Sequence, residues 1–343
     1  MKLLKLIKKN NHPYFDNYVY VDNDNIYTIS PEILLIKKKP KELEHLNGIY
    51  DRNLFINEIY KDRNNPEFMD NLLNDIPKYQ TNHNDWEEEM VLNKKTIKEI
   101  ERISKFRLKK GELSNQKGVG YYKKNFIATN AHYATWLHKP TEEINEHSIV
   151  IPIEAINILK KQNKAVLSTL LLLSKESIKE GGKLIQTFSK YIRFTFNDYT
   201  MYVRCGEITF PNLYGIMLER RHDKFYYFTL NKKELKNYVD KVHKVRKITK
   251  GENSIIEFKE VIESDSTYIS CSYLDENDNI KTSKLFNPYS IINNIKKDIY
   301  VNFDVVLLKL ILETIKDENV TFKGVAPIRA HYINDKYLLM PMR

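Results

Sequence analysis

The sequence predicts an α+β fold built from a repeated unit in which a strand runs into a helix. Two internal repeats in the sequence indicate this unit. Residues 92–98 recur in similar form as residues 230–236, each time where a strand pattern changes to a helical one. Residues 49–61 resemble residues 149–161 in the same way. We therefore expect at least five copies of the unit, beginning near residues 49, 90, 149, 227 and 300. One copy cannot bury both a sheet face and a helix, so the copies should pair into two-layer domains with the helices on one face.

The first half of the chain alternates short strands with helices. Strands are expected at residues 18–21 and 26–29, a strand running into a helix at 48–59, and an irregular polar connection at 62–85. A clearer unit follows Trp86, with a strand at 89–92 and a helix at 94–108 that buries Ile97, Ile100 and Ile103. Further strands are expected at 119–122, 126–129, 191–196 and 200–205, and a further strand-to-helix unit at 148–162.

The second half repeats this plan and closes on a hairpin. The predicted elements are a strand at 226–230, a helix at 232–247, strands at 255–262, 267–274 and 299–303, and a helix at 304–315. Two strand-like pieces, 326–333 and 336–340, then flank a turn at Asn334 and Asp335. Two interpretations of Met340 and Met342 stay open: they fill the edge of the core, or they line a surface groove for partner peptides.

The composition is that of a globular protein. A chain of 343 residues, 42% of them hydrophobic, has room for two or three domains. Cys205 and Cys271 fall in strand-like segments, which indicates buried thiols rather than a disulfide framework or a zinc site. The most apolar run, residues 165–173, is too short to span a bilayer, and the first residues lack the pattern of a signal peptide. We expect a cytoplasmic protein without membrane contact, metal or cofactor.

The net charge favours a polyanionic partner. Lys and Arg number 55 against 45 Asp and Glu, which gives a net charge of +10 and an isoelectric point of about 9.1. Such a balance is typical of proteins that bind nucleic acid. A chain rich in lysine and asparagine also arises from an AT-rich genome, so the charge has two explanations.

Several short motifs occur in an order that resembles a known family. They are residues 85–86, residues 126–134, residues 149–152 before a helix, residues 210–213, and the final four residues 340–343. In this order they resemble the bacterial sliding clamp, the beta subunit of DNA polymerase III, over about residues 84–343. Asn130 and Ala131 stand where the family has Asp-Gly, Tyr133 and Ala134 where it has Arg-Leu, and the family's last Leu is absent after Arg343.

The resemblance implies an architecture and a function. It implies three clamp domains, a shortened first domain at 1–85, a second at 86–221 and a third at 222–343, with sheets outside and helices facing a central hole. The protein would be a processivity factor, and not an enzyme, that encircles double-stranded DNA without reading its sequence, as a homodimeric ring. Its partners would be a replicative DNA polymerase and a clamp loader.

The resemblance also implies a peptide-binding pocket between the second and third domains. Carried over residue by residue, the pocket comprises Thr129, Ala131, His132, Tyr133, Ala134, Pro211, Gly215, Ile216, Leu338, Met340, Pro341, Met342 and Arg343. Adaptable Met and Pro side chains with a few polar groups suit a short linear motif. For His132 a hydrogen-bonded structural role stays open as the alternative.

Basic side chains recur on one side of the predicted helices. On helix 94–108 they are spaced at i, i+4, i+7 and i+11, opposite the isoleucines. The candidate DNA-facing residues are Lys98, Arg102, Lys105, Lys109, Lys160, Lys161, Lys164, Lys233, Lys236, Lys244 and Lys247. Lysines that line a hole would contact phosphates without reading bases. The alternative is that each charged face is simply solvated.

Two rival functions remain. One is a clamp-like factor that binds DNA through its charge without closing a stable ring, which the shortened first domain suggests. The other is a DNA-processing enzyme. The sequence shows no clustered Asp and Glu residues of the kind that bind catalytic metals, which argues against the enzyme.

Overall fold

The fold divides into two compact units, which we describe separately. The structure is a computed structural model and describes residues 18–30, 32–58, 85–108, 116–178, 184–214, 225–249, 255–274, 280–295, 298–326 and 329–342. Unit 1 comprises Met1–Phe126 and Ile144–Pro211, and unit 2 comprises Ile127–Glu143 and Asn212–Arg343. Most of the polar connection predicted at 62–85 lies outside the described residues, as do Lys109, Gly215, Ile216 and Arg343.

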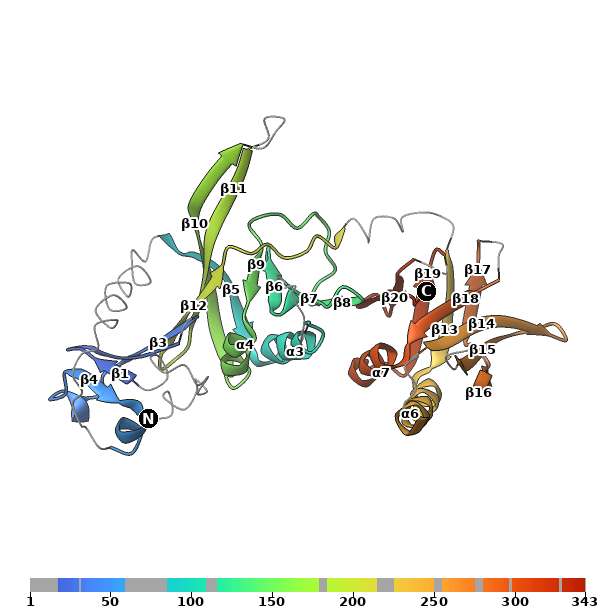
Figure 1. The fold of residues 1–343 in the computed structure, drawn as a ribbon, viewed down its shortest axis with the longest axis horizontal. Helices are drawn as coiled ribbons and strands as arrows, with labels where there is room; N and C mark the ends of the chain where they lie inside the picture. The colour runs from blue at the N-terminus through green and yellow to red at the C-terminus, as the bar shows by residue number, and fades with distance from the viewer. Residues whose placement is uncertain are drawn as a thin grey trace. The chain divides into compact units, whose positions relative to one another are not determined.

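Unit 1 contains an antiparallel sheet of eight strands in the order β4-β1-β2-β3-β12-β11-β10-β5 (Figure 1). Its strands are β1 Tyr18–Val21, β2 Asn25–Ile29, β3 Ile33–Lys38, β4 Gly48–Asp51, β5 Glu87–Asn93, β10 Lys164–Ile178, β11 Leu184–Thr195 and β12 Thr200–Gly206. A short 3-10 helix, Lys41–Leu43, precedes β4. The apolar run 165–173 is part of β10, where one edge pairs with β11 and the other with β5.

Three α-helices and a second strand pair lie among the described residues of unit 1. The helices are α1 Arg52–Ile56, α3 Lys94–Ser104 and α4 Ile153–Leu159, and the strands β6 Val119–Tyr122 and β9 Ile149–Ile151 pair with each other. Helices α3 and α4 pack side by side (Figure 1). Ile97, Ile100 and Ile103 of α3 are buried, as predicted. The helix ends at Ser104 rather than Leu108, because the chain turns there and buries Phe106 completely.

The described residues of unit 2 form two sheets and two long helices. In the larger sheet, the strands of this unit run in the order β17-β13-β19-β20-β21-β8-β7, and the second sheet has the order β16-β15-β14-β18. Their bounds are β7 Asn125–Thr129, β8 Tyr133–Trp136, β13 Tyr226–Asn231, β14 Ile255–Glu263, β15 Ser266–Leu274, β16 Ile280–Phe286, β17 Ser290–Asn293, β18 Tyr300–Asp304, β19 Asn319–Gly324, β20 His331–Ile333 and β21 Tyr337–Leu339. Helices α6 Lys232–Thr249 and α7 Val305–Thr314 pack against each other (Figure 1).

All five predicted strand-to-helix junctions are confirmed, and most share one capping device. The junctions are β4–α1, β5–α3, β9–α4, β13–α6 and β18–α7. Side-chain oxygens of Asp51, Asn93, Asn231 and Asp304 accept hydrogen bonds of 2.8–3.1 Å from backbone N–H groups of the first helical turn. Asn and Asp are preferred at this position because they satisfy N–H groups that lack a helical partner. The repeated Asn93 and Asn231 of the sequence are therefore caps, whereas Pro152 before α4 provides no side-chain cap.

A larger repeat also appears, in which two strand pairs are followed by a helix. In the first copy β1 pairs with β4 and β2 with β3, and α1 follows. In the second copy β6 pairs with β9 and β7 with β8, and α4 follows. In the third copy β14 pairs with β18 and β15 with β16, and α7 follows. The strands β3 and β8 are therefore equivalent, and each pairs onward with a strand from much later in the chain, β12 and β21 respectively.

Some elements differ from the sequence expectations. Tyr133–Trp136, for which the sequence predicted no strand, form β8, and the strand expected at 326–333 is confined to His331–Ile333. Strand β8 pairs with β21, which lies far away in the sequence, whereas β20 pairs with its sequence neighbours β19 and β21. Cys205 and Cys271 are buried free thiols, as predicted. Within the described ranges, no helix is long and apolar enough to cross a membrane.

Candidate nucleic-acid and peptide interfaces

The basic face of α6 is partly neutralised by one aspartate. Asp240 accepts a hydrogen bond of 2.6 Å from Lys236 one turn earlier and another from Lys309 of α7. Burial opposes ionisation of Asp240, but these two lysines outweigh it and lower its pKa. The hydrogen bond to Asp240 in turn raises the pKa of Lys309, which also pairs with Glu313 at 3.1 Å. Lys236 is thus engaged within the unit, whereas Lys233, Lys244 and Lys247 are exposed.

Basic side chains gather around His243 in the second half of α6. Burial lowers its pKa, and so do the neighbouring charges of Lys247, Lys309 and Arg246. Neighbouring cations add to the effect of burial because they repel a further positive charge on the imidazole, whereas Asp240 raises the pKa. The same positive charges would attract a phosphate. This end of α6 is therefore suited to an anionic ligand.

In unit 1 the predicted basic residues divide in the same manner. Arg102 on α3 is mostly covered and binds Glu99 at 2.8 Å, and Lys160 after α4 lies 3.7 Å from Glu101. Lys98, Lys105, Lys161 and Lys164 are exposed. Over the part of the chain that the structure describes, none of these four has an ion pair with a carboxylate. Their charges are available to a partner.

A tight turn between β7 and β8 presents His132. The Thr129 hydroxyl donates to the Tyr133 carbonyl at 2.7 Å and accepts from the Ala131 N–H at 3.2 Å. The Asn130 side chain accepts from the N–H groups of His132 and Tyr133 at 3.0 and 3.1 Å. These bonds hold the turn rigid, and Ala131 and His132 at its tip are exposed.

The C-terminal tail is anchored beside this turn, within unit 2. The Met340 N–H donates to the His132 carbonyl at 2.8 Å, and the Met342 N–H donates to the Asn302 carbonyl at 2.8 Å. Strand β21, immediately before the tail, pairs with β8, so that Leu338 lies opposite Ala134. Met340 and Pro341 are half-buried, and Met342 is 37% exposed. Met342 therefore lies at the surface and Met340 is partly covered, on a backbone held in place at both residues.

The predicted pocket residues of unit 2 have two different roles. Thr129, Tyr133, Ala134 and Leu338 are buried and support the turn and the tail. Ala131, His132, Met340, Pro341 and Met342 are accessible to a ligand. Pro211 is the last residue of unit 1 and is half-buried. Sequence reasoning missed Asn302, whose carbonyl anchors the tail; it lies in a strand with no motif to mark it.

The described residues hold no cluster of three or more His, Cys, Asp or Glu side chains arranged for a metal ion. No protein-family model matches the chain, and no curated protein matches it in sequence.

Solved structures match the chain over its whole length. The DNA polymerase III beta chain of Streptococcus pneumoniae TIGR4 is 12% identical, with a TM-score of 0.67 over 100% of this chain and 97% of that one. The DNA polymerase III subunit beta of Pseudomonas aeruginosa is 15% identical, with a TM-score of 0.66 over 99% and 96%. The DNA polymerase sliding clamp of Bacillus subtilis is 12% identical, with a TM-score of 0.63 over 99% and 96%. The chain therefore has the sliding-clamp fold, and the predicted α+β class is confirmed.

Proposed function

We propose that this protein is a DNA sliding clamp, a processivity factor that encircles duplex DNA and tethers a replicative polymerase. The observation that carries the proposal is the sliding-clamp fold over the full chain. The proposal includes three domains, 1–85, 86–221 and 222–343, and a clamp loader that places the ring on DNA. A ring acts by topology, because encirclement keeps the polymerase at high effective concentration near its template. Such a protein performs no reaction of its own and needs no cofactor.

Exposed lysines support a sequence-independent contact with DNA. Lys98, Lys105 and Lys161 in unit 1 and Lys233, Lys244 and Lys247 in unit 2 are exposed at the ends or outer faces of helices. The cations Lys247, Lys309 and Arg246 beside His243 add to the positive charge at α6. Lysines that contact phosphates hold a duplex without reading its bases, which permits sliding.

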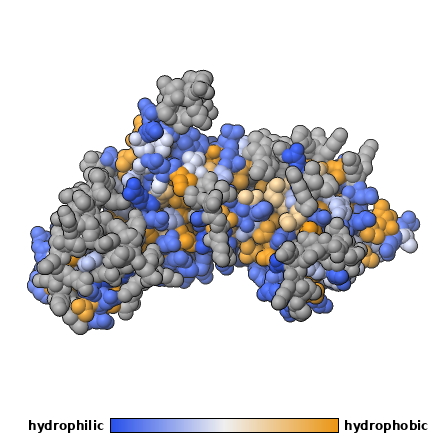
Figure 2. All heavy atoms as spheres, viewed as in Figure 1, coloured by the Kyte–Doolittle hydropathy of each residue, from blue (hydrophilic) through white to orange (hydrophobic). Residues whose placement is uncertain are grey.

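An open strand edge supports a homodimer. The equivalent strands β3 and β8 pair with β12 and β21, but β16 in the third copy pairs only with β15 among the described strands. An unpaired edge offers N–H and C=O groups to a strand of another chain. Leu285 on β16 is 47% exposed, and Figure 2 shows further apolar side chains over the β14–β15 hairpin of the same sheet. A second copy of the chain that supplies a strand here would close a ring.

The anchored tail supports a peptide-binding pocket. The surface consists of adaptable apolar side chains and one imidazole ring, on a backbone fixed by hydrogen bonds. It is formed by His132, Met340, Pro341 and Met342. Flexible methionine side chains suit aliphatic or aromatic anchors of a short peptide. The proposed pocket also includes Pro211, Gly215, Ile216 and Arg343 from the sequence resemblance.

The first test of the ring is retention on circular DNA. The protein would be dissociated in high salt, returned to low salt with a nicked circular plasmid, and separated from free protein on a sizing column. A closed ring stays on the circle when salt is raised again and leaves when a restriction enzyme cuts the plasmid. Equal retention on circular and linear plasmid would favour the open, charge-driven factor instead. A magnesium-dependent nuclease activity in the same samples would support the enzyme alternative.

The pocket is tested separately with the double variant Met340→Ala and Met342→Ala. We expect binding of a labelled peptide from the host's replicative polymerase to weaken by about tenfold or more, since each tenfold corresponds to about 1.4 kcal/mol. Thermal unfolding should change little because Met342 is exposed and Met340 is only half-buried. Ile262→Ala, on an exposed strand end of unit 2, is the matched control. Unchanged peptide affinity in the double variant would refute the pocket.

A further inference from the structure

The junction between the β7–β8 turn and the tail has an internal counterpart inside unit 1. There the turn between β2 and β3 contacts the end of β12. The Ser30 N–H donates to the Ile33 carbonyl at 2.8 Å, as the Asn130 N–H donates to the Tyr133 carbonyl at 3.2 Å. The Arg204 N–H donates to the Glu32 carbonyl at 2.8 Å, and the Met340 N–H donates to the His132 carbonyl at the same distance.

The strand registers extend this equivalence. Val203 lies opposite Ile33 in the β12–β3 ladder, and Leu339 lies opposite Tyr133 in the β21–β8 ladder. Glu32 thus occupies the position of His132, and Arg204 the position of Met340. Residues 204–206 correspond to the tail residues 340–342. One backbone geometry has been used twice, with different side chains.

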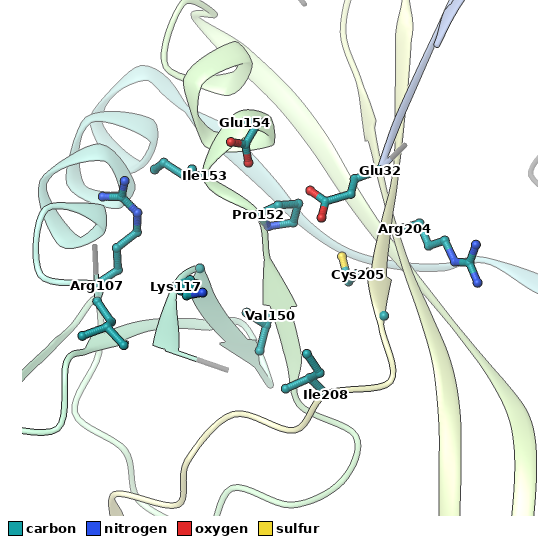
Figure 3. A pocket seen from close by; sticks show the side chains of 13 residues that line it. Glu32, Arg107, Lys117, Val150, Pro152, Ile153, Glu154, Arg204, Cys205 and Ile208 are labelled. Carbon is teal, nitrogen blue, oxygen red and sulfur yellow. The ribbon is translucent and has the colours of Figure 1, made fainter. Parts of the chain in front are cut away.

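A cavity of about 570 Å³ opens at the unit 1 junction (Figure 3). Its walls come from the β2–β3 turn, the segment after α3, the start of α4 and the segment after β12. Apolar side chains of Leu108, Val150, Ile153 and Ile208 line it beside the backbone of Gly118 and Gly206. A volume between about 300 and 1,000 Å³ is usual for a ligand site.

The lining carries two acidic side chains, Glu32 and Glu154, and three basic ones, Arg107, Lys117 and Arg204. Glu32 and Glu154 lie on either side of Pro152, whereas Arg107 and Lys117 lie on the opposite side of the cavity from Glu32, and Arg204 points away from the other side chains (Figure 3). Partial burial and then the charge of Glu154 raise the pKa of Glu32. Two carboxylates that oppose each other's ionisation would both gain from a cation placed near them. The thiol of Cys205 is buried, which raises its pKa and keeps it neutral.

One wall of the cavity is held by a buried lysine. Lys190 is 1% exposed, and its ammonium donates to the Ile208 carbonyl at 3.1 Å and to the Ser148 carbonyl at 2.7 Å. The Phe210 N–H donates to the Ser148 hydroxyl at 2.9 Å. The segment that carries Ile208 is therefore fixed to β11 and to the start of β9. This wall of the cavity is therefore held in place by hydrogen bonds.

We infer that this cavity is a second peptide-binding site, which takes an extended segment of a partner protein with a basic side chain between aliphatic ones. The basic side chain would lie near Glu32 and Glu154, and an aliphatic neighbour would contact Ile153 and Ile208. Successive side chains of an extended peptide point to opposite sides, so a basic side chain can face the acidic wall while its aliphatic neighbour faces the apolar wall. Arg107 and Lys117 would face the peptide carbonyls or an acidic residue further along. The inference rests on the geometry of unit 1 and not on the proposed replication function.

Methyl NMR of the full chain tests this site directly. Protein labelled at the isoleucine δ1 methyl groups would be titrated with acetyl-Leu-Lys-Leu-amide and, separately, with acetyl-Leu-Glu-Leu-amide, to about 10 mM because short peptides commonly bind in the millimolar range. We expect the lysine peptide to shift Ile153 and Ile208 in a saturable manner, while the glutamate peptide shifts them at least tenfold more weakly. Ile292, exposed in unit 2, reports non-specific contact.

A pair of variants with equal charge change completes the experiment. Glu32→Gln with Glu154→Gln should abolish saturable binding of the lysine peptide, whereas Glu263→Gln with Glu318→Gln, at exposed positions of unit 2, should leave it unchanged. The dispersion of the methyl spectrum shows that each variant is folded. Equal response to both peptides, or shifts at Ile292 as large as those at Ile153, would overturn the inference. The native protein alone decides this, even if a variant fails to fold.

Discussion

Ala131 occupies a backbone conformation that suits glycine. Its φ angle is +74°, at the tip of the β7–β8 turn that presents His132. A residue with a Cβ atom pays roughly 1–2 kcal/mol for this left-handed region, whereas glycine does not. Alanine stands here where the clamp pattern has glycine, so this departure in sequence has a physical consequence.

Ala131→Gly should raise the free energy of unfolding by about 0.5–1 kcal/mol, because the relief of strain exceeds the larger entropy of glycine in the unfolded chain. Urea unfolding followed by tryptophan fluorescence measures this. Ala134→Gly, in the buried strand β8, is the control and should destabilise the protein. If Ala131→Gly destabilises it as well, the hydrogen bonds of the turn require the alanine.

Lys190 should make stability depend on pH. Burial lowers its pKa to about 8 from 10.5, so between these values the unfolded chain binds more protons than the folded one. The free energy of unfolding should therefore rise as pH increases from about 8 to 10.5. This part of the rise should vanish in Lys190→Met but persist in Lys164→Met, at an exposed residue. Denaturant unfolding at several pH values compares the slopes, and identical slopes in all three proteins would contradict the assignment.

At the scale of elements, the helices differ in how much of their charge is available. Asp240 binds Lys236 of its own helix and Lys309 of α7, so the middle of α6 carries less free charge than its sequence suggests. Lys233 and Lys244 lie on the exposed side of the same helix. A contact with phosphates should therefore depend on these two lysines rather than on Lys236.

Lys233→Gln and Lys244→Gln should each lower the slope of log affinity against log salt by about 0.9, the value for one phosphate contact on duplex DNA. Lys236→Gln should change the slope less, because Asp240 already neutralises that charge. Lys259→Gln, on strand β14, makes the same change of charge away from the helices. Fluorescence anisotropy of a labelled duplex at several salt concentrations gives the slopes. Equal effects of all four substitutions would indicate a non-specific effect of net charge.

At the scale of the whole molecule, the open edge at β16 predicts dimerisation. Leu285→Glu places a charge on an exposed apolar position of that strand, where a dry interface would have to bury it. We expect the native protein to have a mass of twice 40.8 kDa in solution, and the Leu285→Glu variant to fall toward 40.8 kDa on dilution. Light scattering behind a sizing column measures both masses. Leu173→Glu on β10 introduces the same charge at a residue of similar exposure and should leave the mass unchanged. A native protein that is monomeric at every concentration would exclude the homodimeric ring.

The sequence by itself determined the local features. The five strand-to-helix junctions, the buried Ile97, Ile100 and Ile103 and the turn at Asn334 and Asp335 follow from spacing and capping within a few residues. The repeated Asn93 and Asn231 are caps for the same local reason.

Only the tertiary structure decided which distant segments meet. Pairing of β8 with β21 brings Met340 to His132, and pairing of β3 with β12 brings Arg204 to Glu32. The pattern of apolar and polar residues along a strand does not identify the strand with which it pairs. The bond between Lys309 and Asp240 likewise depends on how α6 packs on α7. Short strands and surface charges have many possible partners of similar local energy. The packing of the whole unit therefore determines which partner each one contacts.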